Sequence, residues 1–334
     1  MTHSIAIKLG SSHTSILKQG EGIVLFEPSL VAYTGTGKSR QVIAVGNKAK
    51  KMQGRTDDAT IVESPIFEGR IADAELAVTM LRSYLAKVIK FGFIRPIVKA
   101  VLCVPIGLSL VERKAFEKVC YMAGIQDVTI VPACICGALG YNLPVTEPRG
   151  VCLVNIGGGS TDIAVVSMNS IVAGVNIGIG GEVMDLAIEK KLEEKYKLII
   201  GKGVAASIKN EIGSLYKNDM SNTEVCGIDA ETKLAKTIVV EASDIFEAIE
   251  KYYEKIVDAI KSVLNNCPPN LVEDVDHEGV FLFGGASLIT GAEQFFRKRL
   301  EMNVKVEDYT TAIDVIGAGK LLSDQALLKK LSEV

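Results

Sequence analysis

The residues best suited to bind a ligand lie in a glycine-rich turn near the middle of the chain. Residues 151–167 read VCLVNIGGGSTDIAVVS, in which two apolar runs flank three glycines and Ser160, Thr161 and Asp162. Glycine has no side chain to block an approaching anion, and successive backbone N–H groups in such a turn form a concave anion site. The pattern predicts two strands joined by a phosphate-binding turn. For this turn alone, an ordinary glycine-rich hairpin explains the residues equally well.

A second stretch near the N-terminus has the same order of residues. Residues 5–16, IAIKLGSSHTSI, superimpose without a gap on the stretch that begins at Leu153, with Gly10 opposite Gly157. This similarity suggests an internal duplication, in which two turns face one polyphosphate. A third stretch, residues 280–288, reads VFLFGGASL and predicts a strand that ends where backbone can approach a ligand at a helix start.

The elements around these turns alternate between strand and helix patterns, which indicates an α/β protein. Asp73 is a predicted N-cap for a helix over residues 74–90, and Ser109 with Glu112 forms a predicted capping box. The small residues of the segment 133–140 allow helices to cross closely, and we expect a hinge there between two domains. Further helices are predicted over residues 182–196, 204–216 and 312–322, and after a cap at Ser243.

Length and composition restrict the class of protein. The 334 residues suffice for two domains with separate cores, and a formal net charge of −3 without a basic stripe argues against nucleic-acid binding. The seven cysteines include no CxxC pair, which indicates reduced thiols, and His3, His13 and His277 lack metal-ligand spacing. No apolar window is long enough to span a membrane, and a predicted strand begins at once, so we expect a cytoplasmic protein.

The two hairpins and the late Gly-Gly-Ala turn resemble those of the actin and Hsp70-type ATPase superfamily. Longer stretches are similar to the bacterial MreB family, including GEGIVLFEPSLVA (residues 20–32), FEGRIAD (67–73), NLPVTEPRG (142–150) and KLIIGKGVAASIKNEIGS (197–214). The similarity covers nearly the whole chain, which looks like a divergent copy of the kind found in spiroplasmas.

The resemblance implies an actin-like fold, with two duplicated α/β domains that flank a nucleotide cleft and that each carry a smaller outer subdomain. Domain I would comprise residues 1–142 and 320–334, with its outer subdomain at about 33–73. Domain II would comprise residues 143–319, with its outer subdomain at about 181–241.

The same resemblance implies that ATP binds between the domains. The expected phosphate-binding residues come from the two hairpins, and they are Lys8, Gly10, Ser11, Ser12, His13, Gly157, Gly158, Gly159, Ser160 and Thr161. The expected nucleoside-binding residues come from the second domain, and they are Gly181, Glu182, Lys209, Glu211, Gly284, Gly285 and Ala286.

Three acidic positions of the MreB pattern are absent from this chain. Lys8 and Asn155 stand where the family has aspartates in its hairpins, and Ala133 stands at the position of the glutamate that orients the attacking water. Because Mg²⁺ and the attacking water both need such groups, we expect no catalytic residue, weakly held Mg²⁺ and slow or absent ATP hydrolysis. Lys8 could contact phosphate oxygens itself. In the alternative, Asp162, Glu27 or Glu182 compensates, and the protein is a fully active filament ATPase.

The resemblance also implies the partners. The chain would form head-to-tail filaments that pair with one another, and paralogous filament proteins would be further partners. The role of these filaments would be cell shape or motility. The residues alone favour burial of Phe91, Phe93 and Ile94, whereas the resemblance favours contact of this loop with the inner face of the cell membrane. Two rival functions are a small-molecule kinase, which would need a carboxylate base, and an Hsp70-like chaperone, which would need a further peptide-binding domain.

Overall fold

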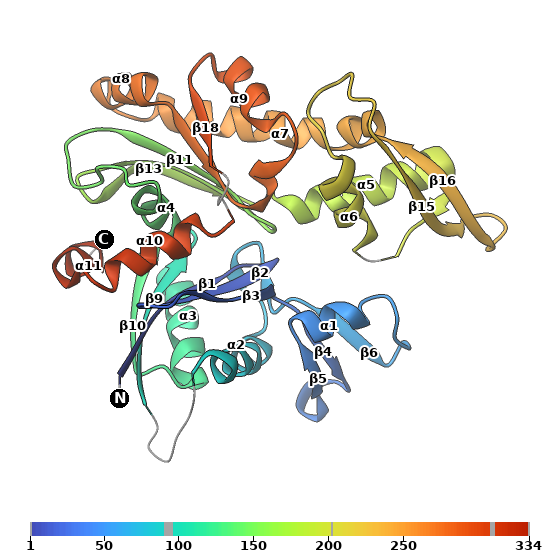
Figure 1. Ribbon diagram of the computed structural model, residues 1–334, viewed down its shortest axis with the longest axis horizontal. Helices are drawn as coiled ribbons and strands as arrows, with labels where there is room; N and C mark the ends of the chain where they lie inside the picture. The colour runs from blue at the N-terminus through green and yellow to red at the C-terminus, as the bar shows by residue number, and fades with distance from the viewer. Residues whose placement is uncertain (1, 90–95, 202, 308–310, 333–334) are drawn as a thin grey trace.

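The computed structural model describes residues 2–89, 96–201, 203–307 and 311–332. Its first large sheet has the strand order β10-β9-β1-β2-β3, in which β1 pairs antiparallel with β2 and parallel with β9. Figure 1 shows this sheet in the lower part of the molecule. The strands are β1 (Thr2–Leu9), β2 (His13–Lys18), β3 (Gly22–Pro28), β9 (Ile97–Val104) and β10 (Asp127–Pro132).

Two capped helices pack beside this sheet, and they are α2 (Ala74–Val88) and α3 (Leu110–Ala123). Asp73 accepts a hydrogen bond from the backbone N–H of Leu76 at 2.9 Å. Ser109 and Glu112 form a capping box, in which each side chain accepts from the other residue's backbone N–H. Both predicted caps are confirmed, and α2 and α3 contribute to one apolar core with β1 and β9.

The second large sheet repeats the topology of the first. Its order is β13-β12-β11-β17-β18, and β11 again pairs antiparallel with the next strand and parallel with a much later one. The duplication predicted from the two hairpins is therefore confirmed. The elements of this half are β11 (Val151–Ile156), β12 (Thr161–Ser167), β13 (Ser170–Ile177), α7 (Ala242–Asn265), α8 (Pro269–Glu278), β17 (Val280–Phe283), a 3-10 turn η2 (Gly285–Leu288), α9 (Ala292–Leu300) and β18 (Val304–Val306).

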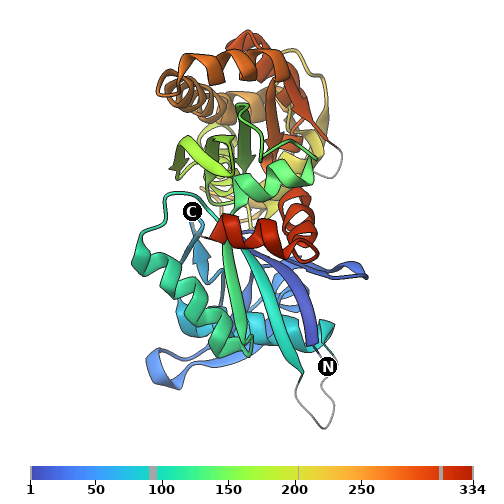
Figure 2. The same cartoon turned by 90° about the vertical axis from the view of Figure 1, so that its left-hand side faces the viewer.

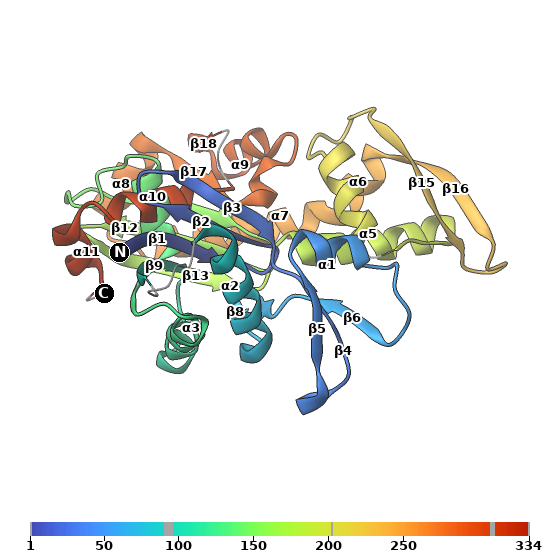
Figure 3. The ribbon, with the colours of Figure 1, turned by 60° about the horizontal axis from the view of Figure 1, so that its bottom comes forward.

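A smaller sheet extends from each half on the same side of the molecule (Figures 1 and 3). The first contains β4 (Val31–Thr34), β5 (Gln41–Val45) and β6 (Thr60–Glu63), with a 3-10 turn η1 (Gly37–Ser39), α1 (Asn47–Met52) and the short pair β7 (Ile66–Phe67) and β8 (Arg70–Ile71) nearby. The second contains β14 (Leu198–Ile199), β15 (Asn222–Asp229) and β16 (Ala235–Glu241), with α5 (Gly181–Tyr196) and α6 (Val204–Ile212). The exact domain boundaries stay a prediction.

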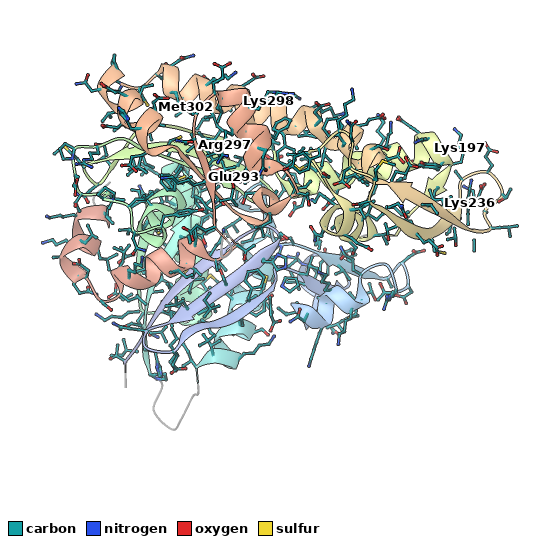
Figure 4. All side chains as sticks on the ribbon, turned by 45° about the horizontal axis from the view of Figure 1, so that its top comes forward. Lys197, Lys236, Glu293, Arg297, Lys298 and Met302 are labelled. Atoms are coloured by element: carbon teal, nitrogen blue, oxygen red, sulfur yellow. The ribbon has the colours of Figure 1, made fainter. Side chains whose placement is uncertain are left out.

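Ion pairs and hydrogen bonds hold the outer sheet of the second half in place. The Lys236 ammonium donates to the Tyr196 carbonyl oxygen and to the Asp229 carboxylate, both at 2.8 Å. Lys236 and Lys197 lie at the outer end of this half, whereas Glu293 and Arg297 lie on α9, near the large sheet (Figure 4).

Two short helices cross between the halves, and they are α4 (Ala133–Gly140) and α10 (Ile313–Leu321). Figure 2 shows α10, followed by α11 (Gln325–Ser332), between the upper and lower halves. A Cβ atom at Gly317 would overlap the carbonyl oxygen of Cys136, and one at Gly140 would overlap that of Ile313. The close crossing predicted from the small residues of the segment 133–140 is thus confirmed.

Two helix boundaries that we predicted from the sequence are wrong. The helix predicted over residues 204–216 ends at Ile212, because Gly213 takes an extended conformation and Leu215 donates its N–H to the Thr290 carbonyl at 2.8 Å. Ser243 does not cap α7, which begins at Ala242, and its hydroxyl bonds to Glu241 at 3.1 Å. Among the described residues, no helix is both long and apolar enough to cross a membrane. The predicted membrane loop, Phe91, Phe93 and Ile94, lies outside the described residues.

Candidate functional site

A cavity of about 500 Å³ lies where the two hairpins meet. Its floor comes from the ends of β1 and β11, and its walls come from the two turns, the starts of α4 and α5, the inner face of α6 and η2. Both halves of the duplicated fold therefore contribute residues to one site.

The two turns have the same internal hydrogen bond and touch each other. The N–H of Gly10 donates to the His13 carbonyl at 3.1 Å, and the N–H of Gly157 donates to the Ser160 carbonyl at 2.9 Å. A Cβ atom at Gly158 would lie 2.5 Å from the Cβ of Ser12. Glycine is therefore required at position 158 because the first turn packs directly against the second.

Most of the predicted site residues line this cavity. They are Lys8, Gly10, Ser11, Ser12, His13, Gly157, Gly158, Gly159, Ser160, Gly181, Glu182, Lys209, Gly285 and Ala286, together with Asn155 and Ala133.

Three predicted residues are not among those that line the cavity. The Thr161 hydroxyl is buried and donates to the Ile179 carbonyl at 2.6 Å, and this hydrogen bond links β12 to the segment before α5. Gly284 adjoins the cavity and supplies a left-handed turn, with φ of 92°, before η2. Glu211 accepts a hydrogen bond from Thr223 at 3.1 Å on the side of α6 that faces β15.

Lys8 forms an ion pair that the sequence did not predict. Its ammonium contacts the carboxylate of Asp314, in the first turn of α10. Asp314 is fully buried and also accepts a hydrogen bond from the N–H of Val315 at 2.8 Å. Burial lowers the pKa of Lys8, but the charge and hydrogen bond of Asp314 raise it by more, so the pKa lies above its usual value. We therefore expect Lys8 to be a cation at the cavity floor at neutral pH.

The other charged group of the floor is Asp162, which is 2% exposed. It accepts hydrogen bonds from the N–H of Ile106 at 3.1 Å and from Asn176 at 2.8 Å, both to Oδ1. Burial raises the pKa of Asp162 to about 6, against the opposing effect of these hydrogen bonds and of Lys8. Asn155 adjoins it, with Nδ2 3.5 Å from the second oxygen of Asp162 and its own Oδ1 buried without a hydrogen-bond partner in the described structure.

The raised pKa of Asp162 predicts a specific pH dependence of stability. The folded protein holds a proton on Asp162 up to about pH 6, whereas the unfolded chain releases it near its usual pKa of 3.8. The unfolding free energy contributed by Asp162 is therefore highest in acid and falls as the pH rises through this window. The quantity to compare is the unfolding free energy of wild type minus that of Asp162→Asn. We expect it to fall by about 3 kcal/mol from acid to neutral pH, because only the wild type carries the titrating carboxyl group.

Urea unfolding of both proteins on each side of this window measures the difference. The exposed substitution Asp127→Asn is the control for changes in net charge, since Asp127 lies on the surface, where it pairs with Lys99 at 3.3 Å. A difference between wild type and Asp162→Asn that stays constant with pH would contradict the assignment.

His13 does not supply a second cation at neutral pH. Its ring stacks on Phe26 with centroids 4.9 Å apart, and its Nδ1 is 2.9 Å from the Ser12 hydroxyl. Burial, together with the charges of Lys50 and Lys8, lowers the pKa of His13 to about 4. The neutral ring can therefore offer a hydrogen bond to a ligand, but no charge.

The wall formed by α5 and α6 contains residues that sequence reasoning missed. Lys209 reaches from α6 to the Asp185 carboxylate and to the Gly181 carbonyl, both at 2.6 Å. Asp185 lies one helical turn after Gly181, so helical spacing could have identified it. Tyr253 comes from the middle of α7, and its hydroxyl donates to the Ala286 carbonyl at 2.7 Å and so positions the η2 turn.

The described residues do not form a carboxylate site for a divalent metal. No cluster of three or more His, Cys, Asp or Glu side chains suited to a metal occurs in the described parts of the chain. Lys8 and Asn155 occupy the floor, and Ala133 lies at the start of α4. Glu27 accepts from Lys87 at 2.6 Å and from the N–H of Asn47 at 3.1 Å, and it is not among the lining residues. Asp162 is the one carboxylate of the described floor, and it lies beside the Lys8 ammonium, so this donor set does not suit Mg²⁺.

Two duplicated sheets around one cavity define an actin-like fold. The crystal structure of MreB5 of Spiroplasma citri bound to ADP has a TM-score of 0.90 with 28% identity, over 99% of this chain and 98% of that chain. The MamK double helical filament shares the fold, with a TM-score of 0.81 and 18% identity over 97% of this chain and 99% of that chain.

Sequence comparison identifies the family. The family described as MreB/Mbl protein matches residues 2–330, and this chain belongs to that family. Cell shape-determining protein MreB of Escherichia coli (strain K12) is 34% identical over 324 residues, which cover 96% of this chain and 93% of that protein. Cell shape-determining protein Mbl of Bacillus subtilis (strain 168) is 34% identical over 329 residues, which cover 98% and 97%. The predicted family and fold are both confirmed.

Proposed function

We propose that this chain is a nucleotide-binding bacterial cytoskeletal subunit that forms filaments for cell shape or motility and hydrolyses ATP slowly or not at all. The observation that carries the proposal is the cavity between two equivalent glycine and serine turns, at whose floor Lys8 and Asn155 stand in place of carboxylates. Its family membership, the names of its cell-shape relatives and the ADP bound to MreB5 of Spiroplasma citri support it.

Nucleotide binding follows from the chemistry of the cavity walls. The two turns line the same space with glycines and with Ser11, Ser12 and Ser160, and backbone N–H groups and hydroxyls of this kind suit a polyphosphate. On the other side, the Gly181, Gly285 and Ala286 backbones leave room for a flat base, and Lys209 closes the wall. In this proposal, the phosphates lie between the hairpins and the nucleoside lies between α5, α6 and η2.

The support for slow hydrolysis is that Ala133 stands at the position expected to orient the attacking water, and that the described carboxylates of the cavity lie elsewhere. Asp162 already accepts two hydrogen bonds on Oδ1 and is held by the backbone of Ile106. Glu182 lies at the start of α5, where burial and the charges of Asp185 and Glu68 raise its pKa. Neither group replaces a carboxylate at position 133, and loss of a water-positioning group costs about 10²-fold or more in rate.

The remaining parts of the proposal concern partners. The subunits would assemble head to tail, and MamK, which shares the fold, is known in a double helical filament. Paralogous filament proteins are further partners in this proposal. The protein would lie in the cytoplasm at the inner face of the cell membrane, with residues 91, 93 and 94 as the contact.

Phosphate release and sedimentation of the purified protein with ATP and Mg²⁺ test the proposal together. Over concentrations that span the assembly threshold, we expect the pelleted fraction to rise, nucleotide to accompany the protein, and phosphate release to stay near the background of a heat-denatured sample. Rapid Mg²⁺-dependent release would identify a fully active filament ATPase. Protein that neither sediments nor retains nucleotide would overturn the proposal, and phosphate transfer to a small alcohol would favour a kinase.

A further inference from the structure

The floor of the cavity contains a charge arrangement that does not require a metal ion. Lys8 lies at the end of β1, just before the first turn, and its ammonium contacts Asp314 of α10, while Asp162 of the second hairpin lines the same cavity. The Asp314 carboxylate is fully buried, and in the described structure its only ionic partner is Lys8.

The local charge balance decides what the floor can accept. Two carboxylates, or carboxylates together with phosphate oxygens, neutralise a divalent cation, whereas one carboxylate neutralises an ammonium. Lys8 with Asp314 is such a neutral pair, and Asn155 adds no charge. Asp162, on β12, is then the one further carboxylate among the described floor residues, which is too few for a divalent cation beside an ammonium. An added Mg²⁺ would meet the Lys8 ammonium at close range in a poorly solvated site, which is unfavourable. The site therefore disfavours the metal and keeps a cation available to phosphate.

Asp314 also decides whether Lys8 stays charged. A buried lysine without a partner tends to lose its proton, because burial disfavours the charged form. The Asp314 carboxylate reverses this effect and holds the ammonium at the floor. The position of Asp314 depends on α10, and α10 is held in place by its own Lys320, which donates to the Leu139 carbonyl at 2.5 Å and to Asn142 at 2.7 Å. An ammonium has three donors, so Lys8 can keep Asp314 and contact a phosphate oxygen at once.

We infer that this protein binds nucleoside phosphates without a divalent cation, because the Lys8 ammonium, held by Asp314 as a positioning residue, takes the place of the metal's charge. This inference rests on the proposed nucleotide-binding function and specifies the ligand as the metal-free nucleotide.

Titration of the full-length protein with fluorescent N-methylanthraniloyl-ADP, in excess Mg²⁺ and in excess EDTA, tests the inference. For wild type and for Lys8→Arg, which keeps the cation, we expect dissociation constants in the two solutions that agree within about threefold. The double variant Lys8→Met/Asp314→Asn removes both charges while keeping the net charge of the protein, and we expect at least about tenfold weaker binding in both solutions.

A charge-reversed variant completes the design. Lys8→Asp/Asp314→Asn places a carboxylate at the floor and removes the like charge of Asp314 beside it, and we expect its binding to need Mg²⁺. Tenfold or greater loss of wild-type affinity in EDTA would overturn the inference while the proposed function stands. No binding by wild type in either solution would overturn the proposed function and the inference with it. Electron paramagnetic resonance with Mn²⁺ gives a second readout, in which immobilised Mn²⁺ in the wild-type ADP complex would contradict metal-free binding.

Discussion

The triple variant Lys8→Asp/Ala133→Glu/Asp314→Asn is expected to release phosphate from ATP about 100-fold faster than wild type, and only with Mg²⁺. The reason lies in two missing groups. A carboxylate at position 8 can help to hold Mg²⁺ on the phosphates, and a glutamate at position 133, at the start of α4, can orient water in the cavity. Phosphate release at saturating ATP measures the effect.

The third substitution is necessary because of the ion pair. An aspartate at position 8 beside an unchanged Asp314 would place two like charges in a buried site, which destabilises the protein or leaves one of them protonated. The matched control is Lys8→Asn/Ala133→Gln/Asp314→Asn, which has similar side-chain sizes without the two carboxylates and should stay at the wild-type rate. If the triple variant binds ATP, sediments like wild type and still releases phosphate at the wild-type rate, then the three substitutions are not what limits hydrolysis.

Gly317→Ala is expected to lower the free energy of unfolding by about 3 kcal/mol or more. A Cβ atom at this position would overlap the Cys136 carbonyl oxygen, so α10 and α4 would have to move apart. Alanine favours a helix by about 1 kcal/mol over glycine, so intrinsic propensity predicts the opposite sign. The overlap is with backbone that a rotamer change cannot relieve, and we expect it to outweigh the propensity. Urea unfolding followed by circular dichroism measures the change.

Gly201→Ala is the matched control for this stability prediction. Gly201 is exposed, and the nearest atom to a Cβ there is Cγ2 of Val204, at an ordinary contact distance of 3.8 Å. We expect this substitution to change the unfolding free energy by less than about 0.5 kcal/mol. Equal urea midpoints for Gly317→Ala and Gly201→Ala would mean that the two central helices separate at little cost.

Local patterns in the sequence were sufficient to predict much of the fold. The caps at Asp73 and Ser109 depend on residues three apart, and the two glycine-rich turns depend on contiguous residues, so both kinds of signal lie within a short window. The helix end at Ile212 was missed because tertiary pairing of Leu215 with Thr290 competes with the helical pattern. No local rule contains that information.

The candidate site was predictable where the backbone determines it and less so where side chains do. The ion pair of Lys8 and Asp314 joins the first strand to one of the last helices, and no spacing in the sequence connects them. Glu211 was grouped with Lys209, although residues two apart on a helix face different sides, and only Lys209 lines the cavity. Applying that rule to α6 would have removed Glu211 from the expected set.

The two halves of the fold are copies in backbone but not in charge. Across the first hairpin Lys8 pairs with Ser15, and at the equivalent place across the second hairpin Asn155 pairs with Asp162. Divergence after the duplication thus left a cation on one strand pair and an acid on its counterpart, within the same geometry. The floor of the cavity is therefore positive on one side and negative on the other, which the symmetric backbone alone would not produce. An anion that enters the cavity is attracted to the half that carries Lys8.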